Sequence, residues 1–161
     1  MRSLRSYGTV LLFAGGVGIT HQVSHLKDLV TAFGTGLCST RKVVLVWTVR
    51  SVEQLKWAKS WLDDLKSMPH YGNSVKYMLY VSKPPKLVEG REARLGPFCG
   101  EEIFTGRPNV ETLIERIVRG RVGAMAVGVC GPGALADDVR KGARGVMVGC
   151  KVDFWEEAFT W

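Results

Sequence analysis

The chain has 161 residues, the size of one domain, and its 46% hydrophobic and 23% charged residues exclude an intrinsically disordered protein. No apolar stretch approaches the ~20 residues of a membrane-spanning helix, and the four widely spaced cysteines lack the CxxC pair of a zinc ribbon. The net charge of +7 should attract anions, and we favour a solvated basic surface over a nucleic-acid surface. The basic residues are not interleaved with aromatic side chains, so we expect no nucleic acid.

The first predicted unit is a strand, a glycine turn and a helix. Thr9–Ala14 is a short apolar run that indicates a buried strand, and Gly15–Gly18 follows it as a tight turn. From Thr20 onward, apolar residues recur at steps of three and four until Gly34, which predicts an amphipathic helix.

The second unit repeats this order. Val43–Trp47 is a continuous apolar run typical of a buried strand, Val52–Leu65 has the period of a helix, and Val75–Val81 predicts a third strand. Residues 82–106 are polar and contain several prolines and glycines. A stretch of this length inside a domain indicates a functional loop, a surface insertion or the carrier of a short strand near Glu102–Phe104.

The last third of the chain resumes the alternation. Asn109 is a suitable N-cap for a helix over Val110–Val118, and Gly123–Val129 predicts another buried strand. The turn Cys130–Gly133 leads into a helix over Ala134–Ala143.

Strands that alternate with helices in this way predict an α/β fold. We expect a three-layer, Rossmann-like parallel sheet of about five strands, with helices on both faces and right-handed crossovers. Residues 1–161 are expected to form this one domain. In such sheets ligands bind beyond the carboxyl ends of the strands, so the turns at those ends are the candidate sites.

The first candidate site is the glycine turn at Gly15–Gly18. Glycines between a strand and a helix let backbone N–H groups approach a phosphate, and the helix N-terminus adds a favourable dipole. No Lys-Ser/Thr pair follows the last glycine, unlike a P-loop, and His21 occupies the third glycine position of G-x-G-x-x-G counted from Gly16. The alternative is a plain tight turn; the placement favours a diphosphate cradle.

The second candidate site is Thr48-Val49-Arg50-Ser51, at the end of the second predicted strand. In dinucleotide sites an acid here hydrogen-bonds a ribose 2′-hydroxyl, whereas an arginine accommodates a 2′-phosphate. Because the first acid is Glu53, the pattern favours NADPH over NADH. The alternative is an exposed arginine at the start of a helix.

The third candidate site is Cys130-Gly131-Pro132-Gly133. Small residues at the end of a strand leave room for a planar ring, and Pro132 is suited to start a helix. The alternative is a buried cysteine that acts as a small hydrophobic residue. No His or Lys is adjacent in sequence, which disfavours an activated thiol nucleophile.

His21 and His25 are four residues apart on a predicted helix, a spacing that can bind a metal ion. No third ligand neighbours them in the sequence, and His70 is the only other histidine. We therefore favour two surface histidines beside a phosphate site and expect no metal.

Five motifs along the chain are similar to those of one family. The motifs, in chain order, are Ala14–Thr20, Val46–Arg50, Gly106–Asn109, Val129–Pro132 and Glu156–Trp161. Together they resemble the C-terminal NADPH-binding domain of fungal ferric-chelate reductases, which is similar to that of the NADPH oxidases and belongs to the ferredoxin-NADP reductase superfamily. The resemblance extends over nearly the whole chain.

The resemblance implies how the chain would bind NADPH. Arg50, with Ser51, would hold the 2′-phosphate, and Arg107 and Pro108 would help to line the adenosine side. The residues that would cradle the pyrophosphate are Gly15, Gly16, Val17, Gly18, Ile19 and Thr20.

The resemblance also implies which residues act at the hydride-transferring end. Cys130 and Gly131 would lie against the nicotinamide and set its C4 toward the flavin, and Pro132 completes the cofactor-binding set. In this superfamily a C-terminal aromatic residue covers the flavin ring, a role that falls to Trp161 with Phe159 as the fallback. The alternative for this tail is an aromatic plug that completes the core.

Complete members of the family carry an upstream flavin-binding barrel with a His-Pro-Phe type motif and, before it, a haem-bearing membrane domain. This chain has three histidines, none followed by proline, and no predicted spanning helix. We therefore expect the nucleotide half of a reductase. It would be a soluble, cytoplasmic-side domain whose partners are the flavin-binding and haem membrane domains of an integral membrane parent.

The implied function is NADPH-dependent oxidoreduction of the ferric reductase type. The domain would present hydride from NADPH to FAD, for one-electron transfer through haem to ferric iron, and by itself it is expected to be inactive. One alternative is a non-catalytic dinucleotide-binding or interaction module that lacks its flavin partner. The other is a domain of a superoxide-forming NADPH oxidase, which the Thr160-Trp161 ending mildly disfavours.

Overall fold

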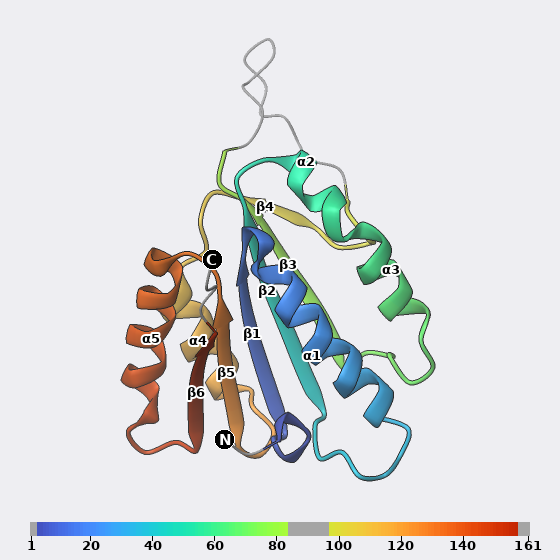
Figure 1. Cartoon of the computed structure of the whole chain (residues 1–161). Coiled ribbons are helices and arrows are strands. Elements are labelled where there is room, and N and C mark those ends of the chain that lie inside the picture. The colour runs from blue at the N-terminus through green and yellow to red at the C-terminus, as the bar shows by residue number, and fades with distance from the viewer. Residues whose placement is uncertain (1–2, 84–96, 158–161) are drawn as a thin grey trace.

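The computed structural model describes residues 3–83 and 97–157, and its centre is a six-stranded sheet (Figure 1). The strands are β1 (Thr9–Gly15), β2 (Lys42–Val49), β3 (Val75–Val81), β4 (Ile103–Thr105), β5 (Met125–Cys130) and β6 (Val152–Glu157). They lie in the order β4-β3-β2-β1-β5-β6, and all neighbours are parallel. The carboxyl ends of all six strands therefore share one edge of the sheet.

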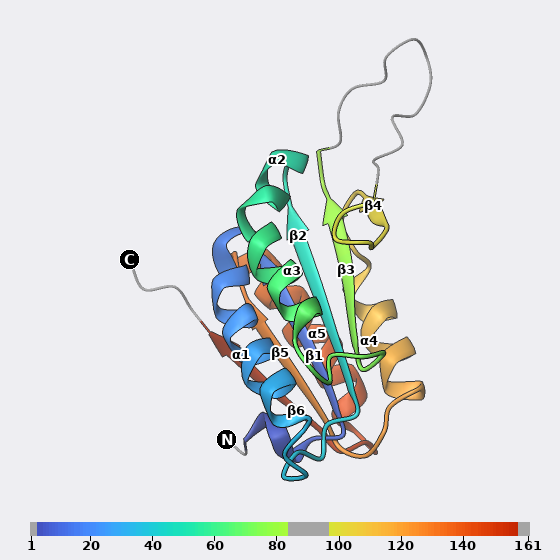
Figure 2. The same ribbon diagram turned by 90° about the vertical axis from the view of Figure 1, so that its right-hand side faces the viewer.

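Helices cover both faces of this sheet. Figure 2 shows α1 (Ile19–Ala32) and α3 (Lys59–Ser67) on one side and α4 (Val110–Arg119) on the other. In residues 3–83 and 97–157, no helix is long and apolar enough to cross a membrane. The other helical segments are α5 (Gly133–Met147), α2 (Val52–Leu55) and the 3-10 turns Leu4–Ser6, Gly16–Gly18 and Lys56–Ala58.

The central strand β1 is buried along its whole length, as expected for a parallel sheet covered on both faces. Its side chains alternate between two cores. Val10 and Leu12 belong to the cluster that includes residues of α1 and α3, whereas Leu11 and Phe13 belong to the cluster with α4 and α5. Packing on both faces fixes the end of β1, where the glycine turn begins.

The structure confirms the predicted fold class, with one strand more than expected. β6 forms one edge of the sheet, and β4 is the short strand considered near Glu102–Phe104. The helix expected over Val52–Leu65 is divided, because the backbone leaves the helical region at Ala58 (φ −106°, ψ 4°). Residues 84–96 of the predicted polar excursion lie outside the described residues.

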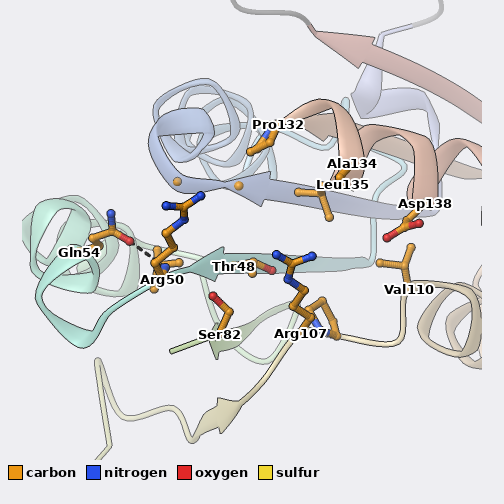
Figure 3. Close-up of a pocket in the computed structure, with 14 residues that line it drawn as sticks. Thr48, Arg50, Gln54, Ser82, Arg107, Val110, Pro132, Ala134, Leu135 and Asp138 are labelled. Atoms are coloured by element: carbon orange, nitrogen blue, oxygen red, sulfur yellow. Dashed lines mark hydrogen bonds between the residues drawn. The ribbon is translucent and has the colours of Figure 1, made fainter. Parts of the chain in front are cut away.

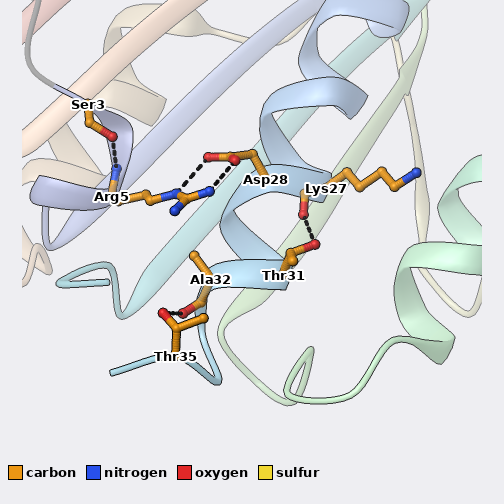
Figure 4. A network of polar contacts seen from close by, with 7 residues as sticks. All are labelled: Ser3, Arg5, Lys27, Asp28, Thr31, Ala32 and Thr35. Carbon is orange, nitrogen blue, oxygen red and sulfur yellow. Dashed lines mark hydrogen bonds and ion pairs between the residues drawn. The ribbon is translucent and has the colours of Figure 1, made fainter. Parts of the chain in front are cut away.

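An ion pair fastens the start of the chain to α1 (Figure 4). Arg5 donates from Nε to Oδ2 of Asp28 at 3.0 Å and from Nη2 to Oδ1. The hydrogen bond from Arg5 lowers the pKa of Asp28, and the same contact raises the pKa of Arg5. Because water reaches both side chains, this pair contributes little to stability.

Candidate functional site

A cavity of about 340 Å³ lies at the carboxyl edge of the sheet, within the usual range for small-molecule sites. It opens beside the ends of β1, β2 and β3, close to the point where the strand order reverses. Open α/β sheets bind their ligands at such a point. The lining residues (Figure 3) are Gly15, Gly16, Thr48, Val49, Arg50, Gln54, Ser82, Arg107, Pro108, Val110, Pro132, Ala134, Leu135 and Asp138.

The glycines of the first turn have different structural roles. Gly16 has a φ of +54°, a conformation that other residues rarely adopt, and its carbonyl accepts a hydrogen bond from Nε1 of buried Trp47 at 2.9 Å. A Cβ at Gly18 would lie 2.0 Å from the carbonyl oxygen of Cys130. Gly18 therefore allows the start of α1 to pack directly against the end of β5.

Gly15 faces the cavity and the turn after β5. A Cβ there would lie 2.6 Å from Cδ of Pro132 and 3.0 Å from Cδ2 of Leu135. A Cβ at Gly131 would lie 2.9 Å from the backbone nitrogen of Gly15. Two backbone segments thus approach each other without side chains between them, which leaves backbone at the wall of the cavity.

Arg50 reaches the cavity from the end of β2 (Figure 3). Its backbone is fixed by Gln54, whose Oε1 accepts hydrogen bonds from the backbone N–H of Arg50 at 2.7 Å and of Ser51 at 3.4 Å. These hydrogen bonds cap the start of α2. They involve the backbone of Arg50, so its exposed guanidinium group remains available to an anion.

Arg107 brings a second positive charge to the same cavity from the segment before α4 (Figure 3). Asn109 caps that helix, because its Oδ1 accepts a hydrogen bond from the backbone N–H of Thr112 at 3.1 Å. The cap fixes where the segment enters α4 and so where Arg107 and Pro108 lie. Asp138, from α5, is the one acidic side chain among the lining residues.

Cys130 lies at the end of β5 and is buried. Burial first, and then the negative charge of Glu157, raises the pKa of this thiol to about 11. The thiol is therefore neutral near pH 7, which agrees with the expectation that it is not an activated nucleophile.

The structure brings most of the predicted segments to one edge but divides them into two groups. The predicted residues that line the cavity are Gly15, Gly16, Arg50, Arg107, Pro108 and Pro132. The predicted residues that neighbour this wall without lining it are Val17, Gly18, Ile19, Thr20, Ser51, Cys130 and Gly131. Trp161 and Phe159 lie outside the described residues.

Sequence reasoning missed several lining residues. Thr48 and Val49 lie in the second candidate site, but neither residue was given a role in binding. The remaining ones are Gln54, Ser82, Val110, Ala134, Leu135 and Asp138. Topology is the signal that could have found them, because they lie just after a strand or in the first turns of helices at the carboxyl edge.

The two histidines of α1 meet a carboxylate. Both His21 and His25 approach Glu157, the last residue of β6. This carboxylate is far from the histidines in the sequence, so the sequence alone did not indicate the contact. Within the described ranges, no group of three or more His, Cys, Asp or Glu side chains has a geometry that could hold a metal ion.

Comparison with known proteins gives a match to the family model described as the ferric reductase NAD binding domain. The match covers residues 7–95, more than half of the chain. A solved structure of the CS-b5R domains of human Ncb5or, in its NAD+ form, superposes with a TM-score of 0.62 over 98% of this chain and 38% of that chain. Its sequence identity is 17%, so this likeness supports the fold.

Curated relatives come from two kinds of protein. A probable cell surface ferric reductase, kap2 of Aspergillus oryzae, is 39% identical over 35% of this chain, and the ferric/cupric reductase transmembrane component 2 of Schizosaccharomyces pombe is 26% identical over 70%. Human dual oxidase 2 is 26% identical over 81% of this chain. The chain spans 7%, 19% and 10% of these relatives, respectively.

Proposed function

The chain belongs to the ferric reductase NAD-binding domain family, and from this premise we propose that it binds NADPH along the carboxyl edge of its sheet and presents the hydride to FAD. The flavin would be held mainly by a separate flavin-binding domain. The electrons would then pass singly through the haem of a membrane-bound parent to ferric iron.

The observation that carries this proposal is the pairing of two guanidinium groups with a glycine wall in one cavity. Arg50, Arg107 and the backbone of Gly15 and Gly16 all line it. Guanidinium groups bind phosphate oxygens in a two-pronged manner, which suits the 2′-phosphate that distinguishes NADPH from NADH. The hydroxyls of Thr48 and Ser82 provide further donors to a ribose or phosphate.

The pyrophosphate would lie against the glycine turn and the start of α1. The N–H of Ile19, the first residue of α1, donates to the carbonyls of Gly16 and Val17, while the cap residue Gly18 has no side chain to accept from the next N–H groups. An anion at this end would accept from those groups and interact favourably with the helix dipole. The fit of the glycine backbone to a diphosphate supports the nucleotide assignment.

The nicotinamide would lie at Cys130 and Gly131, at the other end of the same edge. The buried, neutral thiol of Cys130 adds no charge there, and Gly131 adds no side chain, which leaves room for a ring. The chemistry of hydride and electron transfer belongs to the nucleotide and the flavin, while the protein binds, orients and excludes water. Trp161, with Phe159 as the alternative, would cover the flavin ring.

Titration of the 161-residue chain with NADPH and NADH tests the site. We expect Arg50→Ala to weaken NADPH binding about tenfold or more, because it removes a charge-assisted contact, and to leave NADH binding nearly unchanged. Arg119→Ala is the matched control, since Arg119 lies in the last turn of α4 and does not line the cavity. Unchanged NADPH affinity in Arg50→Ala would overturn the assignment.

Oxygen is the second candidate for the terminal electron acceptor, and the match to dual oxidase 2 over 81% of the chain favours it. A reconstituted assembly of this chain with a flavin-binding and a haem membrane domain of the family distinguishes the two. Reduction of a ferric chelate with little superoxide supports the reductase, whereas superoxide as the main product supports the oxidase.

A non-catalytic binding module is the remaining alternative. Fusion of the chain to a flavin-binding barrel of the family tests it. NADPH-dependent reduction of ferricyanide by the fusion supports hydride transfer. Normal NADPH binding without reduction of the bound flavin would support the module instead.

A further inference from the structure

The two histidines that the proposed function does not use both contact one carboxylate. Nε2 of His25 lies 2.9 Å from Oε1 of Glu157, and Nδ1 of His21 lies 3.4 Å from Oε2. His25 and Glu157 are 132 residues apart in the sequence, so the contact joins α1 to the end of β6. We call these three residues the β6 clamp.

Trp155 of β6 packs both on β5 and against the ring of His25. The indole of Trp155 covers Gly128, where a Cβ would be only 2.1 Å from Cζ2 of the ring. The same indole and the ring of His25 pack in a T-shaped arrangement, with the centroids 6.0 Å apart and the planes at 83°. Trp155 and Glu157 are two residues apart on β6 and therefore point to the same face of the sheet. His25 thus lies between an aromatic support and its carboxylate partner.

The β6 clamp lies beside Cys130. In the parallel register of β5 and β6, Cys130 and Glu157 are direct Cα partners at the last position of both strands. The charge of Glu157 adds to burial in raising the pKa of the Cys130 thiol. The side chain of Glu157 is 27% exposed. Among the described residues, His25 is hydrogen-bonded to its Oε1, and His21 approaches its Oε2 at ion-pair distance without a hydrogen bond.

We propose that His21 and His25 are positioning residues that hold the Glu157 carboxylate beside Cys130, so that this thiol stays protonated and unreactive at the end of β5. A thiolate is the form of cysteine that oxidants and electrophiles attack. A fixed carboxylate disfavours a second negative charge nearby. The β6 clamp therefore protects a thiol that lies next to redox chemistry, and only this last statement depends on the proposed function.

The neighbouring acidic residue of α1 has a partner outside the β6 clamp. Asp28 lies about one turn beyond His25 on α1, and it is already paired with Arg5. From β5, Cys130 is the titratable group that faces Glu157. Burial and the charge of Glu157 therefore raise the pKa of Cys130, and the two histidines contact that carboxylate.

Alkylation of Cys130 by iodoacetamide, followed peptide by peptide with mass spectrometry from pH 7 to pH 10, tests the proposal without any nucleotide. We expect Glu157→Gln to speed alkylation about threefold to tenfold at a fixed pH, because less charge opposes the thiolate. His25→Leu should have an effect in the same direction. His25→Gln, which can still donate to the carboxylate, should stay close to the wild-type rate.

The decisive measurement is non-additivity. In the Glu157→Gln background, His25→Leu should change the Cys130 rate by less than about 1.5-fold, because there is no charge left to position. Lys27→Leu, an exposed change on the same helix, is the matched control and should leave the rate unchanged. Equal acceleration by His25→Leu in both backgrounds, or no effect of Glu157→Gln, would overturn the proposal.

Loss of folding is distinguished by Cys38, which is also buried but belongs to the loop before β2. General opening would expose Cys38 together with Cys130, whereas loss of the β6 clamp affects Cys130 alone. Adding NADPH separates the two proposals. If NADPH fails to slow Cys130 alkylation, the nicotinamide assignment fails and the β6 clamp is untouched.

Discussion

The two ends of the carboxyl edge have opposite electrostatic character. At the β2 end, the exposed Arg50 and Arg107 bring positive charge to an open cavity. At the β5–β6 end, Cys130 is buried and protonated, and the charge beside it is the carboxylate of Glu157. One end suits a solvated phosphate, and the other suits an uncharged ring shielded from water.

Under the proposed function, this difference separates phosphate binding at one end of the sheet edge from hydride transfer at the other. NADPH carries its extra phosphate at one end and its reactive ring at the other, and the ends of β2 and β5 present two dissimilar environments at the same edge of the sheet. The glycine turn joins them, because Gly15 and Gly16 line the cavity while Gly18 packs on the backbone of Cys130. Substitutions in the glycine turn should therefore affect both ends of the edge, whereas a substitution at one end should affect that end alone.

The largest effect is expected from Gly18→Ala, which disrupts the contact between the glycine turn and the end of β5. The new Cβ would meet the carbonyl oxygen of Cys130 at 2.0 Å, and both are backbone-fixed, so α1 or β5 has to move. We expect a loss of about 3 kcal/mol in the free energy of unfolding, measured by urea denaturation.

Gly133→Ala is the control for that measurement. Gly133 is the first residue of α5, and a Cβ there has no neighbour within 4 Å. Its free energy of unfolding should change by less than about 0.5 kcal/mol. Equal losses in the two variants would show that the contact between Gly18 and Cys130 does not hold the two ends together.

The next largest effect is expected when the β2 end loses both charges. Arg50→Ala with Arg107→Ala should weaken NADPH binding about 100-fold, close to 2.7 kcal/mol, and bring its affinity near that of NADH. Calorimetric titration of both nucleotides checks this. The alkylation rate of Cys130 should not change, and a parallel change there would mean that the two ends are not independent.

Local patterns in the sequence were sufficient for the fold and for part of the site. The apolar run of β1, the glycines after it and Arg50 at the end of β2 are each recognised from their neighbours in sequence. Ser82 and Asp138 reach the cavity only through the strand order, so their residue types alone gave no signal. His21 and His25 were interpreted as surface residues because their partner, Glu157, lies far away in the sequence.

A smaller effect is expected when the negative charge of Asp138 is removed from the β2 end. Asp138 is the acidic residue among those that line the cavity, and it opposes the binding of an anion there. Asp138→Asn should strengthen NADPH binding about twofold to threefold, with a smaller gain for NADH, which carries less negative charge. The gain should shrink as salt is raised, and an unchanged affinity at low salt would place the 2′-phosphate away from Asp138.

The smallest effect is expected from Asp28→Asn, which lies away from both ends. Because Arg5 lowers the folded-state pKa of Asp28, the pair stabilises the fold above the unfolded-state pKa of the carboxyl, and this contribution is lost as pH falls through the folded pKa. Since the pair is exposed, Asp28→Asn should cost less than about 0.5 kcal/mol at pH 7. Urea denaturation at pH 7 and near pH 3 should show the difference from wild type narrowing at the lower pH. A difference that widens with acid would mean that Asp28 stabilises the fold through contacts other than its charge.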